Sequence, residues 1–183
     1  MNCLKKAIRS SCDAITLAQY RKSEFCINVR IAVQSFRGAE AKAEAERLAD
    51  DLIALVRNYN PKTNEALIRS AFEYGGEMHD GQFRHSGEPY FSHPVAVAAI
   101  LTEQQLDDGT IITALLHDTI EDTKASYTSV SELFGEEVAK LVDGVTKLTN
   151  LQLNSSETKQ AENFRKLFMA MSKDMRVILV KLA

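Results

Sequence analysis

The sequence contains no tryptophan, only three prolines and eight glycines, and few aromatic residues. No run of about 18 apolar residues occurs, so the sequence predicts no membrane-spanning helix. The three cysteines are odd in number and fit no C-x-x-C pattern, which argues against a disulfide framework or a cysteine metal site. A reducing compartment, the cytosol, is therefore expected. The net charge of −3 disfavours nucleic-acid binding, which is typical of strongly basic domains.

Positive charge is concentrated at the N-terminus. Residues 1–38 hold seven of the 22 Lys and Arg residues, only two of the 25 acidic residues, and all three cysteines. Organelle transit peptides share this composition, which also fits a frayed extension or non-native sequence added by an upstream start. We assign this basic N-terminal extension no chemistry and predict one domain over residues 39–183. Its length, with 45% hydrophobic residues in the chain, allows a sizeable core.

Apolar residues recur at helical spacing through most of this domain, and no alternating strand or internal repeat is found. Residues 80–91 are a loop by composition, Thr63 or Asn64 and Ser92 are expected to cap helices, and Gly135 to close one. The sequence therefore predicts an all-α fold of seven to nine helices. The expected helices span residues 40–59, 64–78, 92–105, 110–123, 129–134, 136–148, 158–172 and 174–183.

The stretch LLHDTIEDT, residues 115–123, crowds ionisable and hydroxyl groups at the end of an apolar helix. On one helix, His117 would neighbour Glu121 and Asp118 would neighbour Asp122. Burying these four groups without partners would cost several kcal/mol each, and a divalent cation is a common partner.

A second histidine, His93, could come from another helix. Imidazole and carboxylate ligands suit Mn²⁺, Fe²⁺ or Zn²⁺ better than Ca²⁺, and the expected chemistry is metal-assisted hydrolysis of a phosphoester or pyrophosphate. The alternative is a satisfied helix-end histidine beside a solvated aspartate.

A second feature is the loop RHSGEPY, residues 84–90. Arg84 could stack on a purine or pair with a phosphate, and the alternative is an exposed loop charge. His79 shows no metal spacing and is expected at the surface. Lys147 could face a phosphate, but a solvated helix charge is the preferred interpretation.

Four segments together resemble the hydrolase domain of the RelA/SpoT (Rel/Spo) family. In order, over roughly residues 50–183, they are FRHSGEPYFSHPVAVAAIL, ALLHDTIEDT, LFGEEVAKLVDGVTKL and AENFRKLFMAMSKDMRVILVKLA. Members of this family make and degrade the alarmone (p)ppGpp in the bacterial stringent response. The resemblance implies an all-α HD-domain helical bundle in the bacterial cytoplasm.

The resemblance also implies an activity, that of a Mn²⁺-dependent (p)ppGpp 3′-pyrophosphohydrolase yielding GDP or GTP and pyrophosphate. The implied metal ligands are His93, His117 and Asp118. The implied catalytic residues, which would position and activate water, are Glu121 and Asp122. The implied substrate-binding residues, beside the guanine, are Arg84, His85 and Ser86. The family often has Lys where this chain has His85.

Two departures from the family pattern shape the expectation. In the family the last helix continues into an Asp-Arg-Leu-His-Asn run, whose Asp is the fourth protein ligand, and a synthetase domain follows. This sequence stops at Ala183, so we expect a bundle incomplete at its C-terminus, weakened metal binding and no synthesis. The retained HD and ED pairs imply a hydrolase-competent parent, compatible with a bifunctional synthetase/hydrolase. The alternatives are a generic HD nucleotide phosphohydrolase and a non-catalytic fragment that binds a nucleotide or a partner. The oligomeric state is left open.

Overall fold

The structure is a computed structural model that describes residues 39–149 and 174–183. The expected helix over residues 158–172 and the basic extension over residues 1–38 lie outside the described residues. Within them every regular element is helical, and the only extended pairing is a single bridge between Phe83 and Pro89. The predicted all-α fold is confirmed. The helices are α2 (Ala39–Tyr59), α3 (Glu65–Met78), α4 (Ser92–Glu103), α5 (Asp108–Leu116), α6 (Thr119–Asp122), α7 (Tyr127–Phe134), α8 (Glu136–Thr149) and α10 (Arg176–Leu182).

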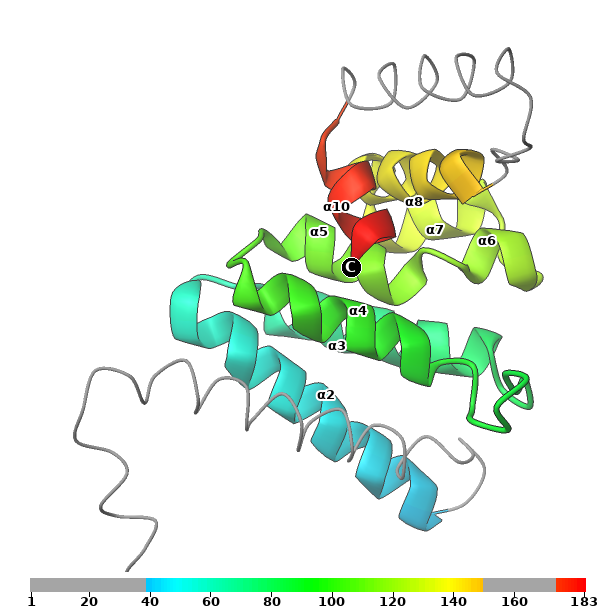
Figure 1. The fold of residues 1–183 in the computed structure, drawn as a ribbon. Coiled ribbons are helices and arrows are strands. Elements are labelled where there is room, and N and C mark those ends of the chain that lie inside the picture. The colour runs from blue at the N-terminus through cyan, green and yellow to red at the C-terminus, as the bar shows by residue number, and fades with distance from the viewer. Residues whose placement is uncertain (1–38, 150–173) are drawn as a thin grey trace, which may run out of the picture.

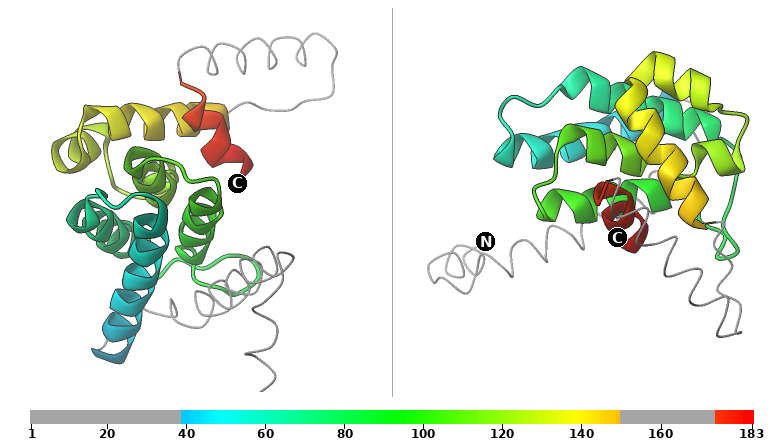
Figure 2. Two further views of the ribbon diagram at one scale, coloured as in Figure 1. Left: turned by 90° about the vertical axis from the view of Figure 1, so that its left-hand side faces the viewer. Right: turned by 90° about the horizontal axis from the view of Figure 1, so that it is seen from above.

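Helix α5 is the centre of the bundle. Helices α2, α3 and α4 lie on one side of it, and α7, α8 and α10 lie on the other (Figures 1 and 2). Every residue from Thr110 to Leu116 is buried, as expected for a helix with neighbours all round. Its threonine hydroxyls donate hydrogen bonds to nearby acceptors: Thr110 to the Asp107 carboxylate and Thr113 to the Gly109 carbonyl. The central helix therefore buries polar residues without leaving them unpaired.

The start of α5 is tied to the connection between α2 and α3 through Asp108. One oxygen of its carboxylate accepts hydrogen bonds from Asn60 Nδ2 and Thr63 Oγ1, both at 2.9 Å, and the other accepts from Asn64 N–H at 2.7 Å. Asn64 in turn caps α3, because its side-chain oxygen accepts from Leu67 N–H at 3.1 Å. Of the two caps that the sequence offers, Thr63 and Asn64, the structure shows Asn64.

Three sequence expectations about helix ends are wrong. Ser92 does not cap α4: its hydroxyl donates to the Pro89 carbonyl at 2.7 Å, and α4 begins at Ser92 itself. The short helix expected from Ser129 begins at Tyr127, because Ser126 and Ser129 form a capping box. The expected helix over residues 110–123 is two helices. The Leu116 carbonyl accepts the Thr119 hydroxyl at 2.7 Å, and Asp118 lies between α5 and α6 with φ −95° and ψ −5°.

Helix α10 packs against α8, α5 and α4. Val177, Ile178 and Val180 are buried, whereas Leu182 is exposed. Arg176 holds the start of α10 in place through Asp174, Asp107 and Glu137, at N–O distances of 2.7 to 3.0 Å. None of the described helices is both long and apolar enough to cross a membrane.

Candidate metal centre

The C-terminal end of α5 presents His117 and Asp118 beside each other in the interior. Both side chains are buried, although both are polar. His117 Nδ1 lies 2.8 Å from the Ala114 carbonyl oxygen, one turn back in the same helix. A carbonyl oxygen can only accept, so Nδ1 carries the proton and the lone pair of a neutral imidazole is on Nε2. The helix thus fixes the tautomer that leaves Nε2 available as a ligand.

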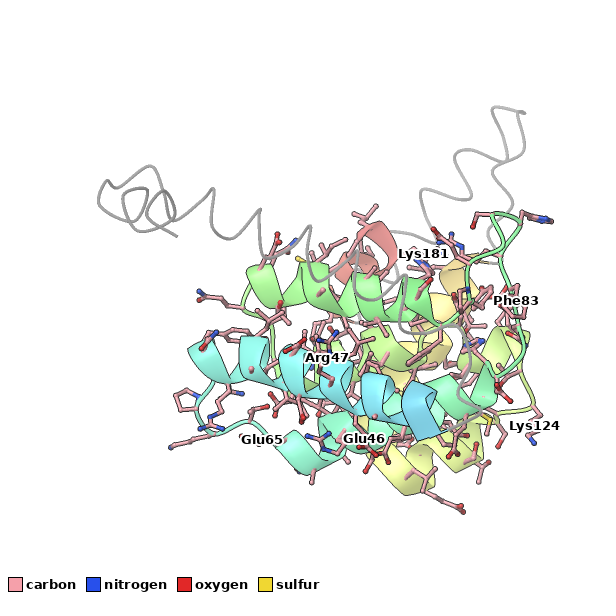
Figure 3. All side chains as sticks on the ribbon, turned by 90° about the horizontal axis from the view of Figure 1, so that it is seen from below. Glu46, Arg47, Glu65, Phe83, Lys124 and Lys181 are labelled. Atoms are coloured by element: carbon pink, nitrogen blue, oxygen red, sulfur yellow. The ribbon has the colours of Figure 1, made fainter. Side chains whose placement is uncertain are left out.

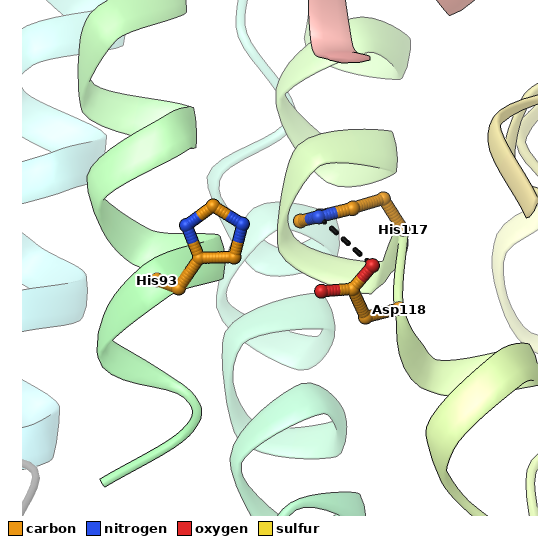
Figure 4. Close-up of side chains that lie close together, drawn as sticks. All are labelled: His93, His117 and Asp118. Atoms are coloured by element: carbon orange, nitrogen blue, oxygen red, sulfur yellow. Dashed lines mark ion pairs between the residues drawn. The ribbon is translucent and has the colours of Figure 1, made fainter. Parts of the chain in front are cut away.

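His93 comes to the same place from the first turn of α4. One ligand atom each from His93, His117 and Asp118 lie within 4.8 Å of one another (Figure 4). The two imidazole rings meet edge to face, with centroids 5.3 Å apart. The sequence prediction that a second histidine from another helix joins the His-Asp pair is therefore right about position. Among the described residues this is the group of three that could hold a metal ion.

The electrostatic environment of the three side chains suits a bound cation. His117 Nε2 lies 3.0 Å from Asp118 Oδ1, so the two atoms attract only if Nε2 is protonated or a cation lies between them. Burial lowers the pKa of His93, and the positive charges of Arg84 and Lys181 act in the same direction, which favours the neutral imidazole that a metal needs. Burial alone would raise the pKa of Asp118, but the hydrogen bond and charge of His117 outweigh it and the pKa is lowered.

The two acidic residues of α6 are placed differently from the expected buried cluster. Glu121 and Asp122 are exposed, so two of the four groups expected inside face solvent. The break between α5 and α6 explains this, because His117 and Glu121 do not share one helix. Residual desolvation, with the negative charges of Asp122 and Asp118, raises the pKa of Glu121. Asp122 remains one turn from Asp118, since its N–H donates to the Asp118 carbonyl at 2.9 Å.

The loop over residues 80–91 contributes a tyrosine that the sequence analysis did not single out. The Tyr90 hydroxyl lies 2.6 Å from Asp122 Oδ2 and 3.1 Å from Asp118 Oδ2. Burial, the hydrogen bond to Asp122 and the charge of Asp118 raise the pKa of Tyr90 far above its usual value, so the hydroxyl stays protonated. Tyr90 was missed because a tyrosine in a polar loop has no spacing signature.

The expectation that His79 lies at the surface is wrong. His79 is 3% exposed at the end of α3, stacked on Tyr90 with ring centroids 4.8 Å apart. Its Nδ1 lies 2.8 Å from Gln82 Oε1, and Gln82 Nε2 donates to the Asp122 carbonyl at 2.9 Å. The loop folds back over α3 and buries the ring, which sequence spacing could not reveal.

The predicted substrate-binding residues are at the tip of this loop. The Arg84 N–H donates to the Glu88 carbonyl at 2.8 Å and the Gly87 N–H to the Arg84 carbonyl at 2.8 Å, with Gly87 at φ +83°. Arg84, His85 and Ser86 are exposed, and Arg84 lies close enough for its charge to act on His93. Neighbouring Phe83 is 60% exposed on the loop (Figure 3).

Of two lysines outside the loop, Lys181 acts on the centre through its charge and Lys147 is paired on α8. Lys181 lies close enough to the centre that its positive charge lowers the pKa of His93 and opposes the rise at Glu121. It comes from the last turn of α10, and Figure 3 shows it on the same side as the loop. Lys147 is exposed and pairs with Asp143, as expected for a solvated helix charge.

Residues 71–183 match the HD domain family model, which covers the whole metal centre. A protein of Brucella abortus (strain 2308), named GTP pyrophosphokinase rsh, is 55% identical over 133 residues, 73% of this chain and 18% of that protein. A GTP pyrophosphokinase of Myxococcus xanthus is 55% identical over 131 residues, 70% of this chain and 17% of that protein. The bifunctional (p)ppGpp synthase/hydrolase SpoT of Escherichia coli (strain K12) is 51% identical over 136 residues, 74% of this chain and 19% of that protein.

These matches confirm the expected resemblance to the RelA/SpoT family. The chain spans about a fifth of the length of these relatives. The residues that match the HD domain model include the three candidate metal ligands and the acidic pair of α6. The imidazole of His117 and the carboxylate of Asp118 are buried, and with the half-buried imidazole of His93 they form a group that could hold a metal ion.

Proposed function

This chain belongs to the HD domain family, and on that premise we propose that it is a hydrolase domain that removes the 3′-pyrophosphate of (p)ppGpp with Mn²⁺ as cofactor. Water cleaves the bond between the ribose 3′-oxygen and the adjacent phosphorus, which gives GDP or GTP and pyrophosphate. The observation that carries the proposal is the convergence of His93, His117 and Asp118 beside the α6 carboxylates. We take residues 39–183 as the HD-type unit and the bacterial cytoplasm as its location.

The surroundings of the two candidate histidine ligands favour the binding of a cation. The Ala114 carbonyl fixes the ring of His117, and burial lowers the pKa of His93. A divalent cation held there acts as a Lewis acid toward phosphate oxygens and makes water a stronger acid. His93, His117 and Asp118 would be the three protein donors to such an ion, a number that catalytic metal sites commonly have. Mixed imidazole and carboxylate donors fit Mn²⁺.

The exposed carboxylates of α6 are placed to handle the water proton. Glu121, whose pKa is raised above its usual value, is the side chain better suited to accept the proton of the water. Asp122 is held by the Tyr90 hydroxyl and is suited to orient the water. Both carboxylates belong to the short helix that begins directly after Asp118.

Positive groups border the centre where a polyphosphate would lie. Arg84 and Lys181 both act electrostatically on His93, so both are within reach of an anion bound there. Arg84 with His85 and Ser86 forms the exposed tip of a loop closed by Gly87, and we propose this tip as the guanine-binding side. Cations at this edge would also compensate the repulsion between the substrate and the acidic residues of α6.

The test is pyrophosphate release from ppGpp by the 183-residue chain with Mn²⁺. We expect turnover that is lost in His117→Ala/Asp118→Ala and retained in Lys147→Ala, a solvated control on α8. Turnover of dGTP at a comparable kcat/KM would instead favour the generic nucleotide hydrolase. No release of pyrophosphate from ppGpp, with a folded chain and bound Mn²⁺, would refute the proposal and favour a non-catalytic nucleotide-binding domain.

A further inference from the structure

Tyr90 occupies an unusual position between two carboxylates with different predicted roles. Its hydroxyl contacts Asp122 Oδ2 at 2.6 Å and Asp118 Oδ2 at 3.1 Å, while the other oxygen of Asp118 faces His117 Nε2 at 3.0 Å. The Asp118 carboxylate is therefore held on one side by the hydroxyl and turned toward the imidazole on the other. Rotation of this carboxylate would break both contacts at once.

The ring of Tyr90 is fixed from behind. It stacks on the buried His79 ring at an interplanar angle of 18°, and Tyr90 N–H donates to the Gln82 carbonyl at 2.9 Å. The Gln82 side chain connects the same loop to α6, because its amide donates to the Asp122 carbonyl and its oxygen accepts from His79. The loop and α6 are thus joined through the Tyr90 hydroxyl and the Gln82 amide.

We propose that Tyr90 is a positioning residue that orients the ligand carboxylate of Asp118 and the neighbouring carboxylate of Asp122. A hydroxyl has one proton and donates to one carboxylate at a time, and it places a donor between two negative charges that would otherwise repel. Gln82 supports only α6, since it contacts the main chain of Asp122 and not Asp118. The part of this inference that concerns turnover rests on the proposed function, and the part that concerns metal binding does not.

Substitutions of Tyr90 and Gln82 should have different effects on metal binding by the full chain. Tyr90→Phe keeps the stacking on His79 and removes the hydroxyl, so we expect the Kd for Mn²⁺ to rise about tenfold, the usual effect of losing a support behind a ligand. Gln82→Met should leave that Kd within about twofold. Both variants should lower kcat for ppGpp more than they change KM. Tyr59→Phe is the matched control, because its hydroxyl donates to the Leu106 carbonyl at the opposite end of α5.

Calorimetric titration with Mn²⁺ measures the Kd, and thermal unfolding confirms that each variant is folded. A Kd for Tyr90→Phe within about twofold of the parent, or one that rises equally in Tyr59→Phe, would overturn the inference. So would the absence of Mn²⁺ binding by the parent chain. If the parent binds Mn²⁺ but releases no pyrophosphate, the proposed function fails, while the comparison of Kd values still decides the role of Tyr90.

Discussion

Replacing Gly75 with alanine is expected to destabilise the protein, although the same change stabilises most helix interiors. Gly75 is a buried residue of α3, where helix propensity alone favours alanine by about 1 kcal/mol. A Cβ at this position would lie 2.5 Å from Phe91 Cε2 and 3.0 Å from the Leu115 carbonyl oxygen. Glycine therefore allows α3 to approach both the start of α4 and the end of α5, the two helix ends that hold the metal centre.

The neighbours of Gly75 have little room to move. Phe91 is 1% exposed and packs edge to face on Phe72, with ring centroids 5.2 Å apart. The Leu115 carbonyl belongs to the backbone of the central helix. Overpacking of this kind costs about 3 kcal/mol at the upper end of its usual range. With the gain in propensity subtracted, the free energy of unfolding should fall by about 2 kcal/mol, which lowers Tm by roughly 4 to 8 °C in a chain of this size.

The assay is chemical and thermal unfolding of Gly75→Ala beside Ala66→Gly, an exposed position on the same helix. Ala66→Gly changes helix propensity without a packing clash and should cost less than about 1 kcal/mol, because Ala66 lies in the first turn of α3. If Gly75→Ala is as stable as the parent or more stable, close approach of the backbones does not decide this position and the reasoning is refuted. A loss of Mn²⁺ affinity in Gly75→Ala would further indicate that the fit of α3 sets the geometry of the centre.

Three further outcomes are expected. Asp108→Ala removes the acceptor of three hydrogen bonds from residues 60–64 and should lower the free energy of unfolding in urea by about 2 to 4 kcal/mol. Asp51→Ala, at an exposed position, should change it very little. Equal losses in the two variants would contradict the role of Asp108. Burial lowers the pKa of His79 below its usual 6.5, so the unfolded state binds more protons and the free energy of unfolding should decline as pH falls below about 6.5. His79→Phe should flatten that decline, and an unchanged slope would count against a buried neutral imidazole. Mn²⁺ at 100 times its Kd should stabilise the parent by about 2.7 kcal/mol. It should not stabilise His117→Ala/Asp118→Ala, and stabilisation of that variant would place the ion elsewhere.

Helical periodicity was sufficient to predict the elements that carry their own start and stop residues. The helix ending before Asn60-Pro61, the cap at Asn64 and the close at Gly135 were all predicted from local chemistry. The predictions failed where a hydroxyl could either accept from a main-chain N–H or donate to a main-chain carbonyl. Ser92 binds the Pro89 carbonyl instead of capping, and the Thr119 hydroxyl takes the Leu116 carbonyl at the point where α5 ends. The choice depends on contacts that local sequence does not contain.

The sequence by itself determined that the protein is helical, and that a histidine and an aspartate, the candidates for metal binding, stand together at the end of an apolar helix. It also indicated His93, because a second imidazole was the missing partner. Only the tertiary structure decided that Glu121 and Asp122 face solvent, that His79 is buried, and that Tyr90 lies between two carboxylates. The physical reason is that periodicity reports which residues share a helix face, whereas burial and hydrogen bonding of a loop depend on how it folds back over helices distant in the sequence.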